Sequence, residues 1–366
     1  VVVLSDAASG ARVAVVPAFQ GRVMTSTAGD GSSFGWINHE LVAKGERQPH
    51  INVFGGEDRF WLGPEGGQFS VFFSKDAPFD LFHWQTPAPI DWDTWKAVEM
   101  RPDMARFSAR FALTNYSGFR FDVAVVRTVR VYKRGEIERQ FGIALGKDIN
   151  GVGYATENRI TNAGKEPWRK ESGLLSIWIL GMFKPAPATT IVIPFIPGAE
   201  TALGPVVNDA YFGKVPADRL KIDAKGVLFF RGDGTYRSKI GIPPRRARDV
   251  AGSYDADAGV LTLVKFTLPK DARDYVNSMW EIQKEPFGGD VANSYNDGPP
   301  APGQKPLGPF YELESSSPAA ALAAGQSVTH VHRTLHLKGP ASALDTVARA
   351  ALGVGLTDIT AAFKTP

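Results

Sequence analysis

The sequence predicts an all-β protein built from antiparallel strands, with few short helices. Short runs rich in β-branched and aromatic residues recur along its length. Turn-forming residues separate these runs, and the chain contains 38 Gly and 26 Pro. A clear helical pattern occurs in only one stretch, 342–352. Since no Ser/Gly-rich or Pro-rich linker divides the 366 residues, we expect a single domain over 1–366.

The expected strands begin with a hairpin, in which 1–4 and 11–17 flank a turn at 5–10, followed by a third strand at 21–27. Further strands are predicted at 69–73, 105–111, 121–132, 154–162, 173–183, 189–193, 227–231, 252–254, 260–266, 309–318 and 326–337. A helical turn is expected at 270–275. In the helix at 342–352, Ser342 and Asp345 have the spacing of a capping box.

Composition excludes several classes of partner and site. The formal net charge is +3 with both signs interspersed, so we expect no nucleic acid partner. The absence of cysteine rules out disulfides, thiolate metal sites and a cysteine nucleophile. No run of 18 apolar residues occurs, so membrane insertion is not expected. The start at Val1, without Met, favours a processed, periplasmic or secreted product. The sequence does not indicate the oligomeric state.

The stretch 309–318 is the best candidate for chemistry because it places two acids in a predicted strand. Side chains alternate along a strand, so Phe310, Glu312 and Glu314 share one face. The two carboxylates then stand two strand rises apart, roughly 6.5 to 7 Å, which suits a pair around a sugar ring or a water. The alternative is an edge strand with a solvated acidic face.

The segment 52–67 combines glycine pairs with charged and aromatic residues. Its glycines allow close approach of the backbone to a ligand. Arg59 offers a five-donor fork and Trp61 a flat apolar face, and Glu57 and Asp58 add carboxylates, so all four are candidates for sugar binding. The alternative is a pair of glycine turns around a core tryptophan.

The loop 79–95 is unusually aromatic, with His83 and the tryptophans Trp84, Trp92 and Trp95 between prolines. It is predicted to form the wall of a cleft in which a tryptophan stacks on a sugar. The alternative is a plug for one end of the core.

Three histidines, His330, His332 and His336, share a face of the strand at 326–337. Two histidines two residues apart bind a metal when a carboxylate joins them. No third ligand is defined here, so a structural role is favoured, and we expect neither metal nor cofactor.

Three segments together resemble the galactose mutarotase-like superfamily. They are the glycine-rich 52–61, the Thr-Asn strand end at 158–164, and the late Leu-Glu strand at 313–318, in an order that spans about 50 to 337. The resemblance implies a large antiparallel two-sheet β-supersandwich that binds a sugar or oligosaccharide in a cleft across one sheet.

The resemblance also implies roles. Glu314 matches the base that takes the anomeric hydroxyl proton, whereas the family's acid is a histidine just after the Thr-Asn segment. Here 163–183 contains no histidine and has Ser176 and Trp178 instead. The candidate acids are therefore His83, His330 and His332, and Trp178 joins the candidate binding residues.

The favoured hypothesis is a carbohydrate-active protein of the epimerase or mutarotase type, working by general acid–base catalysis. In it Arg59 clamps the substrate and Trp61 or Trp84 stacks on it. One alternative is a glycoside hydrolase or lyase that pairs Glu314 with Glu312 or with the carboxylates at 57–58. A further alternative is a non-catalytic carbohydrate-binding module.

Overall fold

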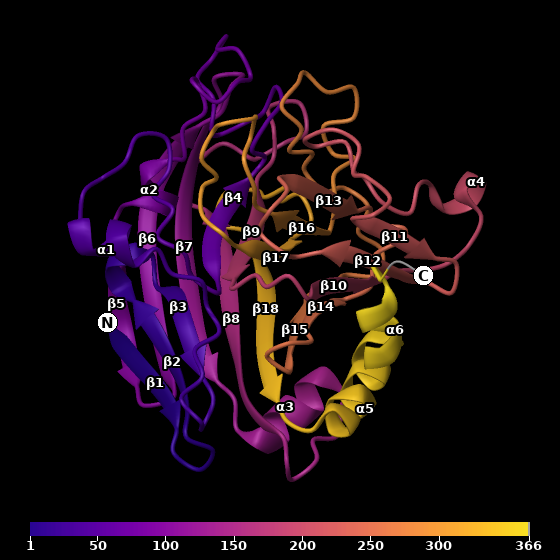
Figure 1. Ribbon diagram of the computed structural model, residues 1–366. Coiled ribbons are helices and arrows are strands. Elements are labelled where there is room, and N and C mark those ends of the chain that lie inside the picture. The colour runs from indigo at the N-terminus through magenta and orange to yellow at the C-terminus, as the bar shows by residue number, and fades with distance from the viewer. Residues whose placement is uncertain (365–366) are drawn as a thin grey trace.

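The computed structural model describes residues 1–364, which form three antiparallel sheets (Figure 1). The largest sheet has ten strands in the order β11-β12-β10-β14-β15-β18-β8-β7-β6-β5. Its strands are β5 (Lys96–Arg101), β6 (Met104–Thr114), β7 (Arg120–Val131), β8 (Asn150–Asn162), β10 (Thr189–Pro194), β11 (Leu220–Asp223), β12 (Val227–Arg231), β14 (Val250–Asp255), β15 (Val260–Phe266) and β18 (Ser327–Lys338).

Two smaller sheets complete the β-structure. The five-stranded sheet has the order β13-β16-β17-β9-β4, with β4 (Arg59–Gly63), β9 (Ser176–Phe183), β13 (Ser238–Ile242), β16 (Ala292–Asn296) and β17 (Tyr311–Ser316). The three-stranded sheet contains β1 (Val2–Asp6), β2 (Ala11–Val16) and β3 (Arg22–Thr27), which confirms the opening hairpin and third strand.

The sheets form a two-layer sandwich because both smaller sheets pack on one face of the ten-stranded sheet. In one core cluster, Leu4 of β1 and Ile177 of β9 join Val125 of β7. In another, Leu313 of β17 joins Ile191 of β10. These apolar residues are fully or almost fully buried, and hydrophobic burial is the main force that holds the layers together. The predicted all-β antiparallel sandwich with few short helices is confirmed.

Short helices occupy the connections and one outer face. They are α1 (His39–Lys44), α2 (Ala88–Asp91), α3 (Arg134–Phe141), α4 (Glu200–Leu203), α5 (Ala341–Leu352) and α6 (Leu356–Ala361), with a 3₁₀ turn η1 (Pro17–Phe19). α3, α5 and α6 share an apolar cluster with the outward side chains of β10, β15 and β18. These helices therefore cover the outer face of the ten-stranded sheet at β10, β15 and β18, and Figure 1 shows α5 and α6 beside these strands.

The predicted helix at 342–352 is present, but its predicted cap is wrong. The N-cap is Pro340, no side chain caps the helix, and Ser342 lies inside the first turn. Asp345 instead accepts a hydrogen bond from the backbone amide of Leu356, at 2.7 Å. This hydrogen bond links α5 to α6, and Asp345 takes no part in capping the start of α5.

Two other predictions about strands have different outcomes. Residues 69–73 are not a strand, because Ser70 donates its amide hydrogen bond back to Gly67 in a turn and the apolar side chains that follow plug the core as a loop. The acidic stretch is a strand, β17, and it lies between β16 and β9. The alternative of an edge strand with a solvated acidic face is therefore wrong, and both glutamates are buried.

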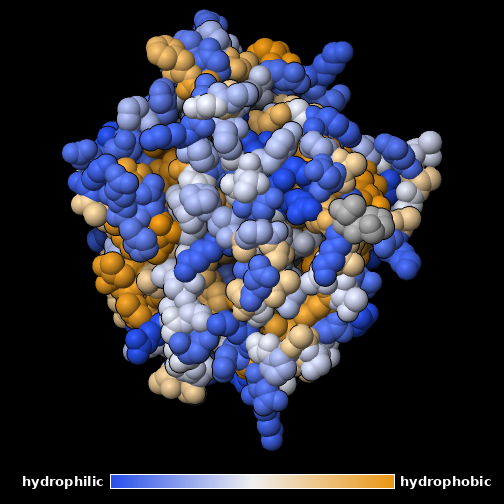
Figure 2. Space-filling model, viewed as in Figure 1, coloured by the Kyte–Doolittle hydropathy of each residue, from blue (hydrophilic) through white to orange (hydrophobic). Residues whose placement is uncertain are grey.

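The surface is mainly hydrophilic on the face shown in Figure 2, with apolar residues in small groups. Among the exposed apolar side chains are Val3 of β1 and Met100 of β5. Within residues 1–364, no helix is both long enough and apolar enough to cross a membrane.

Candidate functional site

The outer face of the five-stranded sheet forms the floor of a pocket of about 130 Å³. Alternate residues of each strand point to this face, and loops from several parts of the chain cover it. The strands contribute Arg59, Trp61, Trp178, Leu180, Met182, Lys239, Tyr295 and Glu312, and the loops contribute Ile51, Glu65, Leu81, Trp84, Phe212, Arg237, Trp280, Asp297, Gly298, Pro300, Lys305, Leu307 and Phe310.

Glu314 occupies the middle of this face. Its neighbours across the sheet are Asn293 of β16 and Leu180 of β9, and its side chain is only 1% exposed. Oε2 accepts hydrogen bonds from Trp178 Nε1 at 2.9 Å and from Lys239 Nζ at 3.1 Å. Oε1 is buried and has no hydrogen-bond partner within residues 1–364. The carboxylate is thus held by one oxygen while the other is left without a protein donor.

Glu312, two residues earlier, has a different partner. It forms a buried salt bridge with Arg59 of β4. Burial raises the pKa of Glu312. The Arg59 guanidinium acts to lower this pKa, and the negative charge of the nearby Glu314 raises it further. Arg59 also stacks on Trp61, with 4.8 Å between the guanidinium carbon and the ring centroid, and its Nε has no partner in the described chain. The two glutamates therefore share a face but not a cation.

Lys239 of β13 connects Glu314 to a second polar group. Its ammonium lies 4.6 Å from the ring centroid of Trp178 and 5.5 Å from that of Tyr211. Burial lowers the pKa of Lys239, but the surrounding carboxylates, Glu314 foremost, raise it above its ordinary value. Tyr211 donates its hydroxyl hydrogen to Asp290 at 2.6 Å, and both residues line a small cavity of about 10 Å³ together with Lys239.

Tryptophans form the wall of the pocket. The ring centroids of Trp61 and Trp178 are 5.5 Å apart, those of Trp61 and Trp84 are 6.5 Å apart, and those of Trp84 and Trp280 are 5.9 Å apart. The indole N–H groups of Trp61 and Trp84 are buried without an acceptor in the described residues. Such a wall offers flat apolar surfaces and free donors, which together suit the face and the hydroxyl groups of a sugar.

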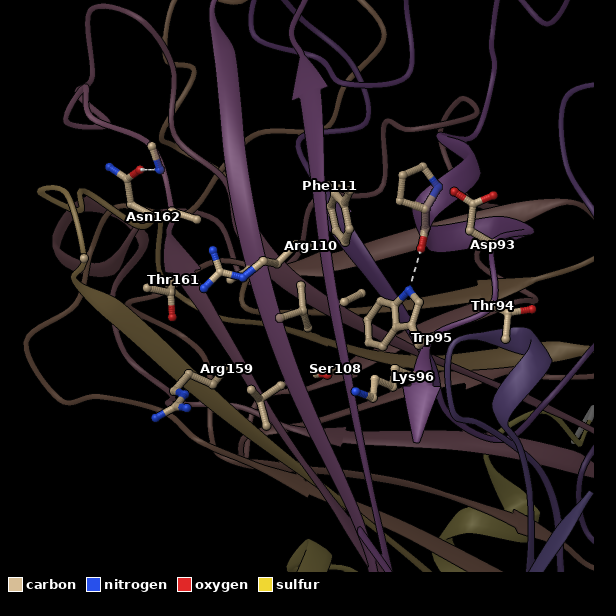
Figure 3. Close-up of a pocket in the computed structure, with 18 residues that line it drawn as sticks. Asp93, Thr94, Trp95, Lys96, Ser108, Arg110, Phe111, Arg159, Thr161 and Asn162 are labelled. Atoms are coloured by element: carbon tan, nitrogen blue, oxygen red, sulfur yellow. Dashed lines mark hydrogen bonds between the residues drawn. The ribbon is translucent and has the colours of Figure 1, made fainter. Parts of the chain in front are cut away.

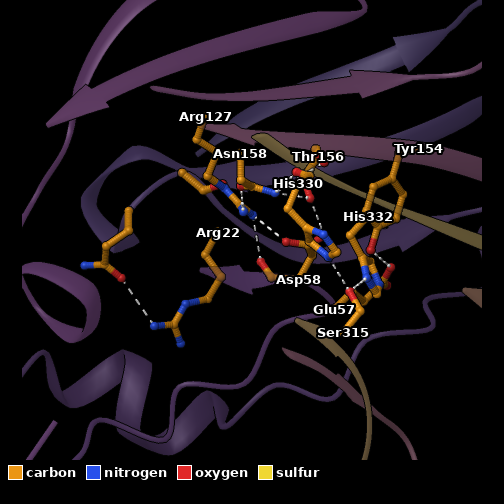
Figure 4. Close-up of polar contacts among 12 residues, drawn as sticks. Arg22, Glu57, Asp58, Arg127, Tyr154, Thr156, Asn158, Ser315, His330 and His332 are labelled. Atoms are coloured by element: carbon orange, nitrogen blue, oxygen red, sulfur yellow. Dashed lines mark hydrogen bonds and ion pairs between the residues drawn. The ribbon is translucent and has the colours of Figure 1, made fainter. Parts of the chain in front are cut away.

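Glu57 and Asp58 lie in a buried polar layer between the sheets, away from the pocket (Figure 4). Glu57 accepts hydrogen bonds from Ser26, Tyr154 and His336. Asp58 forms a fully buried salt bridge with Arg127, at 2.7 Å, and accepts a hydrogen bond from Thr156. These carboxylates are already satisfied, so the expected pairing of Glu314 with one of them does not occur.

The predicted acid histidines do not face Glu314 either. His330 and His332 of β18 both lie 2.8 Å from Ser315 Oγ, and Ser315, as the next residue in β17, points to the opposite face from Glu314 (Figure 4). His83 lies in an exposed part of its loop and pairs with Asp80. The physical reason is that β18 belongs to the other sheet and directs these histidines into the space between the layers.

The sequence-predicted residues thus divide into two groups. Arg59, Trp61, Trp84, Trp178 and Glu312 line the pocket, whereas Glu57, Asp58, His83, His330 and His332 do not. Glu314 lies buried beside the pocket and bonds to its residues Trp178 and Lys239. Residues that sequence reasoning missed include Lys239, Tyr211, Asp290, Glu65 and Trp280. No short motif marks any of them, and only the pairing of distant strands brings them to Glu314.

A second hollow lies on the open outer face of β5 to β8 (Figure 3), with a volume of about 840 Å³. Arg110 and Arg159 border it, and none of the residues singled out from the sequence as catalytic lines it. Within residues 1–364, no group of three or more histidines and acidic residues is arranged to hold a metal ion.

Solved structures with a similar fold include the Slr1438 protein from Synechocystis sp. PCC 6803, with a TM-score of 0.53 and 15% identity over 93% of this chain and 96% of that one. A putative aldose 1-epimerase from Escherichia coli K12 has a TM-score of 0.48 and 14% identity, covering 92% of this chain and 98% of that one. A galactose mutarotase-like protein from Lactobacillus casei ATCC 334 has a TM-score of 0.49 and 10% identity, covering 92% and 99%.

At these identities the likeness concerns the fold alone, and the antiparallel β-sandwich predicted from the sequence is confirmed. A search for similar curated proteins found none. A family model described as "Family of unknown function (DUF6786)" matches residues 1–363, so the chain belongs to that family.

Proposed function

We propose that the protein is a sugar-processing enzyme of the epimerase type, in which Glu314 is the general base. The observation that carries the proposal is the state of the Glu314 carboxylate. Lys239 and Trp178 hold Oε2, while Oε1 is buried without a protein donor. A buried acceptor without a partner is costly in a folded protein, which supports a role toward a ligand.

The chemistry follows from these contacts. The ammonium of Lys239 and the indole N–H of Trp178 hold Oε2 of Glu314, and Oε1, which has no protein donor, is the oxygen that accepts the proton in the proposed step. In an aldose the most acidic proton is on the anomeric hydroxyl. Removal of that proton by Glu314 starts the opening of the sugar ring, and positioned general bases of this kind contribute about 10²- to 10⁴-fold in rate.

The other pocket residues have matching roles in binding. Trp61 and Trp84 present flat faces for the apolar side of a pyranose, and their free indole N–H groups and the free Nε of Arg59 are donors for hydroxyl groups. Glu312 is engaged by Arg59, so we assign it to holding that guanidinium in place rather than to proton transfer.

Exchange between anomers, measured by proton NMR on a panel of aldoses, tests this function. We expect the wild-type protein to accelerate exchange of at least one sugar, and Glu314→Gln to lose about 100-fold or more of that acceleration. Glu281→Gln is the matched control, because Glu281 is exposed on a loop that also carries a pocket tryptophan.

Two further measurements separate the alternatives. Unfolding in urea shows whether Glu314→Gln remains folded, and tryptophan fluorescence reports sugar binding at the aromatic wall. If wild-type exchange equals that of buffer for every sugar, the epimerase function is refuted. A sugar-dependent fluorescence change in that inactive protein would then identify a non-catalytic carbohydrate-binding module.

A further inference from the structure

Glu65 lies on the wall of the same pocket, two residues beyond the end of β4. Its backbone is fixed on both sides. The amide donates to Ser278 Oγ at 3.1 Å, and the carbonyl accepts a hydrogen bond from the Ser70 hydroxyl. The side chain is partly exposed to the pocket, so it is both anchored and accessible to a ligand.

The charges around Glu65 set its protonation. Burial raises its pKa to about 7; Lys239 opposes this rise, and the negative charge of Glu314 adds to it. Arg237 and a hydrogen bond from Trp280 also act to lower it. Lys239 lines the pocket together with Glu65, and it bonds directly to Glu314.

The two carboxyl groups therefore differ in how much positive charge and how many hydrogen-bond donors surround them. Glu314 accepts hydrogen bonds from the Lys239 ammonium and the Trp178 N–H. Glu65 receives less compensation and retains a proton over part of the neutral range. Glu65 lines the pocket, and Glu314 lies buried beside it, bonded to the pocket residue Lys239, so two carboxyl groups in different environments are available for acid–base catalysis.

We propose that Glu65 is the catalytic acid of this pocket, in the place where the sequence lacks a histidine. The inference rests on the proposed function of Glu314. Glu314 takes the anomeric hydroxyl proton, the electron pair of that O–H bond forms the carbonyl, the bond from C1 to the ring oxygen breaks, and the ring oxygen takes the proton of Glu65. Closure on the other face of the aldehyde reverses both transfers, so the cycle needs no further reactant.

The other candidates for the acid are less suitable. Lys239 is tied to Glu314, and the neighbouring carboxylates raise its pKa, so it gives up a proton poorly near neutrality. Burial raises the pKa of Tyr211 well above its ordinary value, and its hydroxyl hydrogen is already donated to Asp290. His330 and His332 lie on the opposite side of the sheet.

The test compares Glu65→Gln with the wild type in the anomer-exchange assay between pH 5 and pH 9. The wild-type rate should fall above about pH 7 as Glu65 loses its proton. Glu65→Gln should lose about 100-fold or more and should no longer show the fall on the alkaline side. Glu281→Gln should keep both the rate and the profile.

The outcomes separate this inference from the proposed function. If the wild type is active and Glu65→Gln keeps its rate or its alkaline fall, Glu65 is not the acid and Glu314 remains the base. If the wild type is inactive on every aldose, both proposals fail. A ¹³C titration of the Glu65 carboxyl gives a readout apart from rate, and an ordinary pKa near 4.3 would also overturn the inference. Urea unfolding and tryptophan fluorescence show whether Glu65→Gln is folded and binds sugar.

Discussion

Acid should destabilise the protein through two buried histidines. His330 and His332 are fully buried between the sheets, and both contact the hydroxyl of Ser315, at 2.8 Å each. His330 Nδ1 and His332 Nε2 have no partner within residues 1–364. No acceptor is therefore ready for the extra N–H that protonation would create on either ring.

The magnitude follows from the pKa difference between the folded and unfolded states. Burial, together with positive charge nearby from the other ring or from Arg127, lowers the pKa of each histidine from 6.5 to about 3. The unfolded chain then binds more protons than the folded one, so stability is complete above pH 6.5 and falls as the pH drops toward 3. Each histidine contributes about 1.4 kcal/mol per pH unit in this window. At pH 4.5 the pair should cost about 5 kcal/mol, comparable to the whole stability of many domains.

The assay is urea unfolding, followed by tryptophan fluorescence at a series of pH values from 8 to 4.5. The quantity to compare is the slope of the unfolding free energy against pH, because any substitution also removes the bond to Ser315. His330→Asn combined with His332→Asn should flatten the slope by about 3 kcal/mol per pH unit, and each single variant by about half of that. His39→Asn is the control, since His39 is exposed. An unchanged slope in the double variant would refute the reasoning.

Two other substitutions test the buried charges. Asp58→Asn leaves Arg127 without a counter-charge and should lower the free energy of unfolding by about 3 to 5 kcal/mol. The control Asp122→Asn, in an exposed ion pair, should lower it by less than about 1 kcal/mol. Equal losses for the two variants in urea unfolding would contradict this. Lys239→Met removes the ammonium from Glu314. It should lower kcat more than it changes KM, and a kcat equal to that of the wild type would count against this role.

Much of the strand pattern is local information, and the sequence contained it. The side-chain period of two in the stretch 309–318 placed Glu312 and Glu314 on one face of a strand, as the structure has them. Aromatic density in the loop 79–95 pointed to the pocket wall, where Trp84 lies, although Trp95 packs in the core. Composition and alternation are enough for such statements because they depend on neighbours along the chain.

Which way a strand face points depends on the second layer, and local pattern does not define it. All residues of β4 are buried, so its sequence does not show which side chains face the pocket, as that of Arg59 does, and which face the space between the sheets. The same holds for β18, where a face of histidines and a threonine is polar enough to suit a cleft yet packs between the sheets. The interior of this sandwich contains a hydrogen-bonded polar layer, so the expectation that polar strand faces point to solvent does not hold here.

The roles of the two glutamates depend on register, which is why spacing alone could not rank them. Lys239 lies in the same cross-strand row as Glu312, through Tyr295, yet its side chain crosses diagonally to Glu314. Arg59 lies in the row of Glu314, through Leu180, yet it bonds to Glu312. Long cationic side chains reach such diagonal positions across an intervening strand. Because of these diagonal contacts, Glu312 pairs with a guanidinium, and Glu314 pairs with an ammonium at only one of its two oxygens. A shift of β17 by two residues would bring one glutamate to the other's cation and leave the second without either, so the assignment of the base is a property of strand pairing between segments far apart in the chain.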